Sequence, residues 1–106
     1  MKLKETDLIK LICDYLEAKG EFFYRNNTGG FRTETGHFYR YGAVGSPDII
    51  IVKNGKYIGV EAKVGKNKMS PAQMTFAENL IDAGGKYILV RDNLDDLILE
   101  LTLYNP

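Results

Sequence analysis

The spacing of apolar residues along the chain predicts three helices. Within residues 4–19, apolar side chains recur every three or four positions, as on the buried face of an amphipathic helix. Ser70 and Pro71 are a typical helix start, because serine suits the N-cap and proline the first helical position. This start predicts a second helix as far as about residue 83. A third is expected from a cap at Asp92 or Asn93 to about residue 103.

Runs of β-branched and aromatic residues predict strands between these helices. They cover residues 21–26, 48–53, 56–64 and 86–91. Asn54-Gly55 separates the second run from the third, and this dipeptide favours a type I′ hairpin turn because both of its central positions need a positive φ. A two-residue turn fixes the register, so the numbers of paired residues sum to 109 and Asp48 lies opposite Glu61.

The intervening segment, residues 27–46, is long and rich in glycine and aromatic residues. A loop of this length is usually functional or disordered, and its aromatic residues argue against plain disorder. A strand is expected within residues 37–41. The resulting order, α-β-(β)-β-β-α-β-α, predicts an α/β fold with a mixed sheet flanked by helices. At 106 residues, the chain is expected to form one domain, residues 1–106.

Composition points to a soluble intracellular protein and hides a charge asymmetry. Lys plus Arg and Asp plus Glu number 14 each, so the net charge is zero. Residues 19–68, however, hold nine basic and four acidic residues, which leaves +5 there and −5 elsewhere. Such asymmetry favours a phosphate-binding face, with scattered solvated charge as the alternative. One cysteine permits no disulfide within the chain, and no stretch approaches the roughly 20 apolar residues of a membrane span.

The chemistry is concentrated on the hairpin. Asp48 and Glu61 are like charges directly opposite each other, which destabilises a sheet unless something compensates. Compensation is available from a raised carboxyl pKa or from a hard cation such as Mg²⁺. Lys63 points the same way as Glu61, so it can orient or deprotonate a water or stabilise developing charge. The pattern favours metal-assisted phosphodiester hydrolysis; the alternative is three solvated groups on a surface hairpin. The apolar run 49–52 is typical of a strand covered on both faces and favours the hydrolytic interpretation.

These residues resemble a known nuclease signature. Pro47-Asp48 followed by Glu61-Ala62-Lys63 looks like the PD-(D/E)XK motif. Within that superfamily, the run G-S-P-D at residues 45–48 and S-P-A-Q at residues 70–73 closely resemble the VRR-NUC domain family. The resemblance extends from the first helix to residue 91 and implies a restriction-endonuclease-like core.

The resemblance also implies roles by position. The metal, Mg²⁺ or Mn²⁺, is expected on Asp48, Glu61, the backbone carbonyl of Ala62 and, through water, Glu5. Lys63 and Gln73 are expected to be catalytic. Two alternatives remain open: Glu5 can favour the helix dipole, and Gln73 can complete a capping box with Ser70.

The implied activity is that of a structure-selective DNA endonuclease. Stand-alone members of the family, many of them phage-encoded, resemble enzymes that resolve four-way (Holliday) junctions, which predicts a homodimer in the cytoplasm, or in the host cytoplasm if phage-encoded. A monomeric nicking or flap nuclease and a non-catalytic DNA-binding module are the alternatives. Phe31, Phe38, Tyr39 and Tyr41 can stack on bases, pack in the core or form a dimer contact. The expected DNA contacts are Arg25, Arg32, His37, Arg40, Lys66 and Lys68.

Overall fold

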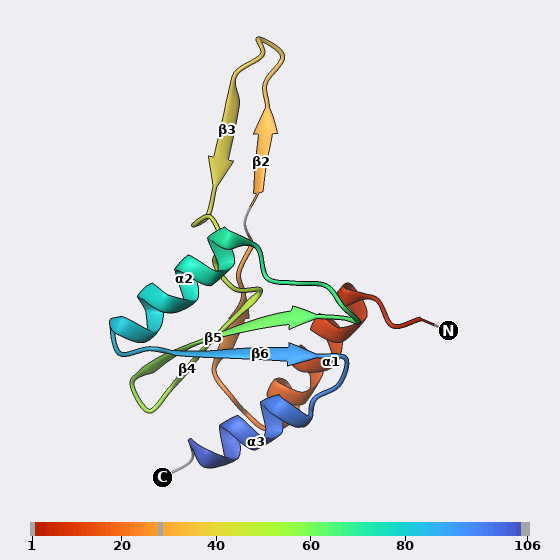
Figure 1. Cartoon of the computed structure of the whole chain (residues 1–106), viewed down its shortest axis with the longest axis vertical. Coiled ribbons are helices and arrows are strands. Elements are labelled where there is room, and N and C mark those ends of the chain that lie inside the picture. The colour runs from red at the N-terminus through yellow and green to blue at the C-terminus, as the bar shows by residue number, and fades with distance from the viewer. Residues whose placement is uncertain (1, 28, 105–106) are drawn as a thin grey trace.

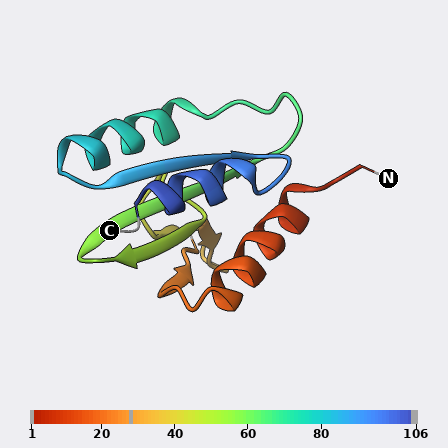
Figure 2. The ribbon, with the colours of Figure 1, turned by 90° about the horizontal axis from the view of Figure 1, so that it is seen from below.

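A four-stranded mixed sheet lies at the centre of the molecule, with helices on both of its faces (Figures 1 and 2). The structure is a computed structural model that describes residues 2–27 and 29–104, and of Tyr41 the backbone alone. The sheet has the order β1-β4-β5-β6, and only the β5–β6 pair is parallel. Its elements are α1 (Glu5–Ala18), β1 (Phe23–Arg25), β4 (Ile49–Lys53), β5 (Lys56–Lys63), α2 (Pro71–Asp82), β6 (Lys86–Arg91) and α3 (Asp95–Leu103).

The hydrophobic core fills the space between the sheet and the pair α1 and α3. Alternate residues of the strands point into it, and the periodic apolar stripe of α1 closes it from the other side. Full burial of such a Leu or Ile side chain contributes about 1.5–3 kcal/mol each. The core consists of Leu8, Ile9, Ile12, Leu16, Ile49, Ile51, Ile58, Val60, Ala62, Ile88, Val90, Leu97 and Leu101. The helix α2 covers part of the opposite face of the sheet (Figure 2), which carries Glu61 and Lys63 together with the buried Ile50.

The central hairpin confirms the predicted register. Asn54 and Gly55 have φ values of 52° and 78°, as a type I′ turn requires. Lys53 pairs with Lys56 and Ile49 with Val60, so partner numbers sum to 109. The expectation that this strand is covered on both faces was wrong at one position, because Val52 is 40% exposed.

A second, two-stranded sheet projects from the body (Figure 1). It consists of β2 (Gly29–Arg32) and β3 (Phe38–Tyr41), and we call residues 29–41 the arm. A strand near β3 was expected, whereas β2 was not, because two consecutive glycines disfavour a strand. Beyond the arm, Gly45 has φ +80° and approaches the backbone carbonyl of Ala72 so closely that a Cβ would overlap it.

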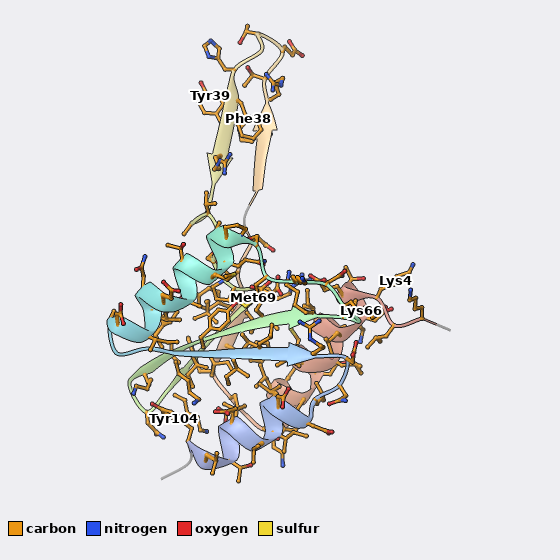
Figure 3. The ribbon with its side chains drawn as sticks, viewed as in Figure 1. Lys4, Phe38, Tyr39, Lys66, Met69 and Tyr104 are labelled. Atoms are coloured by element: carbon orange, nitrogen blue, oxygen red, sulfur yellow. The ribbon has the colours of Figure 1, made fainter. Side chains whose placement is uncertain are left out.

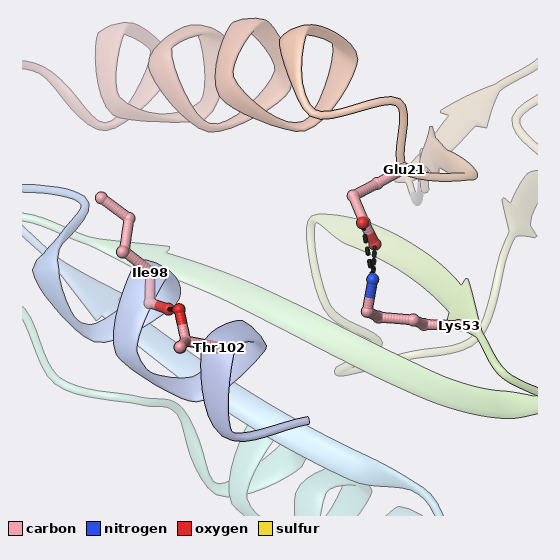
Figure 4. A network of polar contacts seen from close by, with 4 residues as sticks. All are labelled: Glu21, Lys53, Ile98 and Thr102. Carbon is pink, nitrogen blue, oxygen red and sulfur yellow. Dashed lines mark hydrogen bonds and ion pairs between the residues drawn. The ribbon is translucent and has the colours of Figure 1, made fainter. Parts of the chain in front are cut away.

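Polar contacts fix the ends of several elements. The carboxylate of Glu21, after α1, receives the Lys53 ammonium at 2.6 Å, and both side chains are largely buried (Figure 4). In α3, the Thr102 hydroxyl donates to the carbonyl of Ile98 at 2.7 Å (Figure 4). That helix begins three residues after Asp92, later than expected. Among the described helices, none combines the length and the apolar content that a bilayer span requires.

Candidate metal centre

Three carboxylates meet at one end of the central hairpin. Glu5, Asp48 and Glu61 each place an oxygen so that the three atoms lie within 4.8 Å of one another. They come from the start of α1, the residue before β4 and the interior of β5. The predicted register therefore brings Asp48 beside Glu61, and the fold adds Glu5 from a distant part of the sequence.

Backbone contacts hold Asp48 in place. Its Oδ2 accepts a hydrogen bond from the Ala62 amide at 2.8 Å. Its carbonyl accepts from the amide of Asn26 at 2.9 Å, at the end of β1. Ala62 thus contacts the cluster through its N–H, and the role expected for its carbonyl stays a prediction.

Glu5 is free to join the cluster because another carboxylate caps the helix. The amide of Lys4 donates to Oδ2 of Asp7 at 3.1 Å. Glu5, the first residue of α1, is half-buried and points one of its oxygens into the acidic group. The two roles considered for Glu5, as a member of the acidic cluster and as a charge that favours the helix dipole, are compatible, because it lies in the first turn of α1.

Gln73 forms the capping box that the sequence offered and also contacts Glu61, while its catalytic role stays a prediction. Its backbone N–H donates to Oγ of Ser70 at 3.1 Å, and its side-chain Oε1 accepts from the backbone N–H of Ser70 at 2.8 Å. This is a capping box at the start of α2. The remaining donor, Nε2, reaches Oε1 of Glu61 at 3.0 Å. The capping box therefore orients the Gln73 side chain, which in turn donates a hydrogen bond to Glu61.

Glu61 is the most constrained of the three carboxylates. It is 1% exposed. Burial, followed by the negative charge of Asp48, raises the pKa of Glu61 to about 8, against the lowering effect of Lys63. Its Oε2 is buried and has no hydrogen-bond partner among the described residues. A buried carboxylate oxygen without a partner is costly unless a proton or a cation binds there.

Lys63 lies two residues from Glu61 on β5, and its position in the sheet was predicted correctly. It is 8% exposed, which is unusual for a lysine. Since alternate residues of a strand share a face, it lies on the same side of the sheet as Glu61. The site therefore combines three carboxylates with one largely buried cation.

Tyr87 is a component that the sequence did not reveal. Its hydroxyl is buried without a hydrogen-bond partner in the described part of the chain. Burial and then the charges of Glu61 and Asp48 raise the pKa of the Tyr87 hydroxyl. Tyr87 pairs with Gly59, two residues before Glu61, across the parallel β5–β6 ladder. That register depends on the crossover through α2, and no local sequence signal specifies it.

A cleft of about 490 Å³ opens beside Glu5. The Arg91 guanidinium donates to the carbonyls of Gly65 and Asn67 at 2.8 Å each and so holds the loop on one side of the cleft. Of the expected DNA contacts, Lys66 lies on this loop (Figure 3) and lines the cleft. Lys68 follows on the chain and is exposed. The sequence did not single out Lys2 and Lys4, which also line this cleft.

The other expected DNA contacts lie outside the carboxylate cluster. Arg32, His37 and Arg40 are exposed on the arm. Arg25 is exposed at the end of β1, where its positive charge partly offsets the rise that burial causes in the pKa of the Cys13 thiol. The six basic residues therefore divide into a loop group, an arm group and one separate arginine.

The donor set fits a hard divalent cation. Mg²⁺ and Mn²⁺ prefer oxygen ligands, and the cluster offers three carboxylates, one of them with an unpartnered buried oxygen. No soft sulfur ligand is part of this group. Compared with known proteins, the sequence matches no protein-family model and no curated protein.

The raised pKa of Glu61 makes the stability of the metal-free protein depend on pH. Because the folded state binds this proton more tightly than the unfolded state, the stabilisation is complete below pH 4.5 and is lost as the pH rises through about 8. We expect the free energy of unfolding to fall within this window by up to about 1.4 kcal/mol per pH unit. Denaturant unfolding in EDTA at several pH values measures this slope.

The Glu61→Gln variant should lose this part of the pH dependence, because the amide does not titrate. Glu78→Gln, at an exposed position on α2, is the matched control and should retain the wild-type slope. Identical slopes in wild type and Glu61→Gln would contradict the assignment of the raised pKa to Glu61.

Proposed function

We propose that the chain is a Mg²⁺- or Mn²⁺-dependent DNA endonuclease with a PD-(D/E)XK core, similar to the VRR-NUC family, formed as one domain by residues 1–106. The observation that carries the proposal is the buried carboxylate of Glu61, with its unpartnered Oε2, beside Asp48, Glu5 and Lys63. A purely structural hairpin has no use for three clustered carboxylates. A cation-dependent hydrolase needs such a group.

The residues of the site divide the work of phosphodiester hydrolysis. Asp48 and Glu61 would hold the cation, with Glu5 and the carbonyl of Ala62 completing the set. The bound ion supplies a water of lowered pKa and stabilises charge on a phosphoryl oxygen. Lys63 orients the attacking water or stabilises the developing charge. Gln73 fixes Glu61 through the hydrogen bond of 3.0 Å between Nε2 and Oε1.

The basic residues on the loop and the arm support a nucleic-acid substrate. The cleft lined by Lys2, Lys4 and Lys66 also contains Glu5 of the carboxylate cluster, and it can take the phosphates that flank the cut. Lys68 is exposed just after the loop. We propose a branched DNA substrate, with a four-way junction cut on two strands by a homodimer. A non-catalytic DNA-binding module would not need a desolvated carboxylate beside two others.

Loss of one metal ligand should abolish cleavage. We expect Asp48→Asn and Glu61→Gln to cut none of a panel of labelled DNAs: four-way junction, flap, nicked duplex and single strand. Wild type should cut the junction with Mg²⁺ or Mn²⁺ and not in EDTA. Mn²⁺ should raise the melting temperature of wild type, because ligands that bind only the folded state stabilise it. Equal Mn²⁺ shifts in wild type and both variants would rule out the metal assignment, and preferred cleavage of flaps or nicked duplex would favour the monomeric alternative.

Loss of the lysine charge should separate chemistry from binding. Lys63→Met keeps most of the buried side chain and removes the ammonium, so we expect turnover to fall by about 10²–10⁴-fold. The Mn²⁺-induced rise in melting temperature and the affinity for DNA in EDTA should stay near wild type. Lys10→Met, at an exposed position on α1, is the matched control. Wild-type turnover in Lys63→Met would exclude a catalytic role for this residue.

Paired cuts on a junction require two active sites. We therefore expect static light scattering at micromolar concentration to give twice the mass of the chain, which is 12.0 kDa. A monomeric mass together with single nicks on the junction would favour the flap or nicking alternative. A monomeric mass together with paired cuts would mean that the dimer assembles on DNA.

A further inference from the structure

The arm carries aromatic side chains that the body of the protein does not bury. Phe31, Phe38 and Tyr39 are 55%, 53% and 52% exposed, which excludes the core packing considered for them. Figure 3 shows Phe38 and Tyr39 well away from the helices and the four-stranded sheet. A two-stranded hairpin is at best marginally stable alone in water, and exposed aromatic clusters mark interaction sites. The exposed aromatic side chains of the arm are therefore typical of an interaction surface.

One face of the arm combines two arginines with an aromatic ring. Arg32 lies opposite Phe38, and Gly30 lies opposite Arg40. The Phe38 ring lies over Gly30 so closely that a Cβ there would overlap it. The guanidinium carbons of Arg32 and Arg40 each lie 5.8 Å from the centre of the ring. We call Arg32, Phe38 and Arg40 the arginine face.

The other face of the arm has a different chemistry. Phe31 lies opposite Tyr39, and their rings stack with centres 5.6 Å apart. The ring of His37 lies 6.4 Å from that of Tyr39. We call these three residues the aromatic face. It carries no arginine, so the two permanent positive charges of the arm lie together on the arginine face.

The arginine face fits duplex DNA. An arginine that stacks on a ring keeps most of its N–H groups at the edge, where they can reach phosphates; here Arg32 gives one of them to the carbonyl of Gly36. The major groove of B-DNA, about 12 Å wide, admits a two-stranded β-ribbon, whereas that of duplex RNA is deep and narrow. We propose that the arm lies in the major groove of duplex DNA with its arginine face against the groove wall, which rests on the proposed function in taking DNA as the substrate.

The foot of the arm is attached to the candidate metal centre. Nδ2 of Asn26 donates to Oγ of Ser46 at 2.7 Å and to the carbonyl of Pro47 at 3.0 Å. The Asn26 amide donates to the carbonyl of Asp48 at 2.9 Å. The chain entering the arm and the chain leaving it are thus joined beside a metal ligand. In the proposed complex, the arm would place the duplex relative to the carboxylate cluster and so influence where the strand is cut.

Binding in EDTA isolates the arm from the chemistry. We expect Arg32→Gln/Arg40→Gln to bind a labelled 30-bp DNA duplex about 10–100-fold more weakly by fluorescence anisotropy, with a salt slope smaller by about two. Lys10→Gln/Lys19→Gln removes the same charge from exposed positions on and just after α1 and should leave the affinity within about twofold, because those lysines lie outside the proposed contact. Phe31→Ser/Tyr39→Ser, on the aromatic face, should also retain the affinity. Circular dichroism and melting temperature report whether each variant folds.

A footprint of the wild-type protein tests the groove without any substitution. Guanine N7 lies in the major groove, so bound protein should protect it from dimethyl sulfate over a short tract of the duplex. Absent protection, tighter binding to duplex RNA, or equal losses in the arginine-face and aromatic-face variants would each overturn the proposal. A change of oligomeric mass in Arg32→Gln/Arg40→Gln with unchanged DNA affinity would reassign the face to a second copy of the chain. Duplex binding that depends on the two arginines, without any cleavage in Mg²⁺ or Mn²⁺, would contradict the proposed nuclease activity and support the proposed role of the arm. Cleavage by the wild type, together with unchanged DNA binding by the Arg32→Gln/Arg40→Gln variant, would support the nuclease activity and contradict the role of the arm.

Discussion

The desolvated carboxylate of Glu61 is the constraint around which the site is organised. Its charge is unfavourable where it lies, since burial and the neighbouring Asp48 both raise its pKa. The fold supplies one hydrogen bond to Oε1, from Gln73, and leaves Oε2 without a partner among the described residues. A proton relieves this situation at low pH, and under the proposed function a divalent cation would relieve it at higher pH. The proposed metal affinity and the pH-dependent stability of the metal-free site would therefore be two consequences of the same desolvation.

The rest of the fold keeps this unfavourable group in place. Alternation along β5 sends Val60 and Ala62 into the core and Glu61 and Lys63 to the opposite face. Burial of the apolar residues on one face thus stabilises a strand whose other face carries buried charges. Gln73 connects this strand to α2 through its capping box, so the start of the helix and the orientation of the carboxylate depend on one side chain.

Local patterns were sufficient to predict the elements that form by short-range rules. The Asn54-Gly55 turn gave the β4–β5 register, and with it the proximity of Asp48 to Glu61, because turn type determines pairing. The helix start at Ser70 and the strand β6 were also predicted correctly. The site was less accessible where it depends on tertiary contacts. Tyr87 reaches it through a parallel pairing that only the crossover establishes, and Lys4 reaches the cleft through the packing of α1.

The arm shows why the long glycine-rich segment was predicted only in part: a strand near β3 was expected, and β2 was not. Its strands bury no core residue, so they lack the alternation of apolar and polar positions from which strands are recognised. Gly30 disfavours a strand by propensity, yet here it makes room for the Phe38 ring between two arginines. The hydrogen bonds of Asn26 join the chain that enters the arm to Pro47 and Asp48, so in the proposed complex they would link the position of bound DNA to the candidate metal centre.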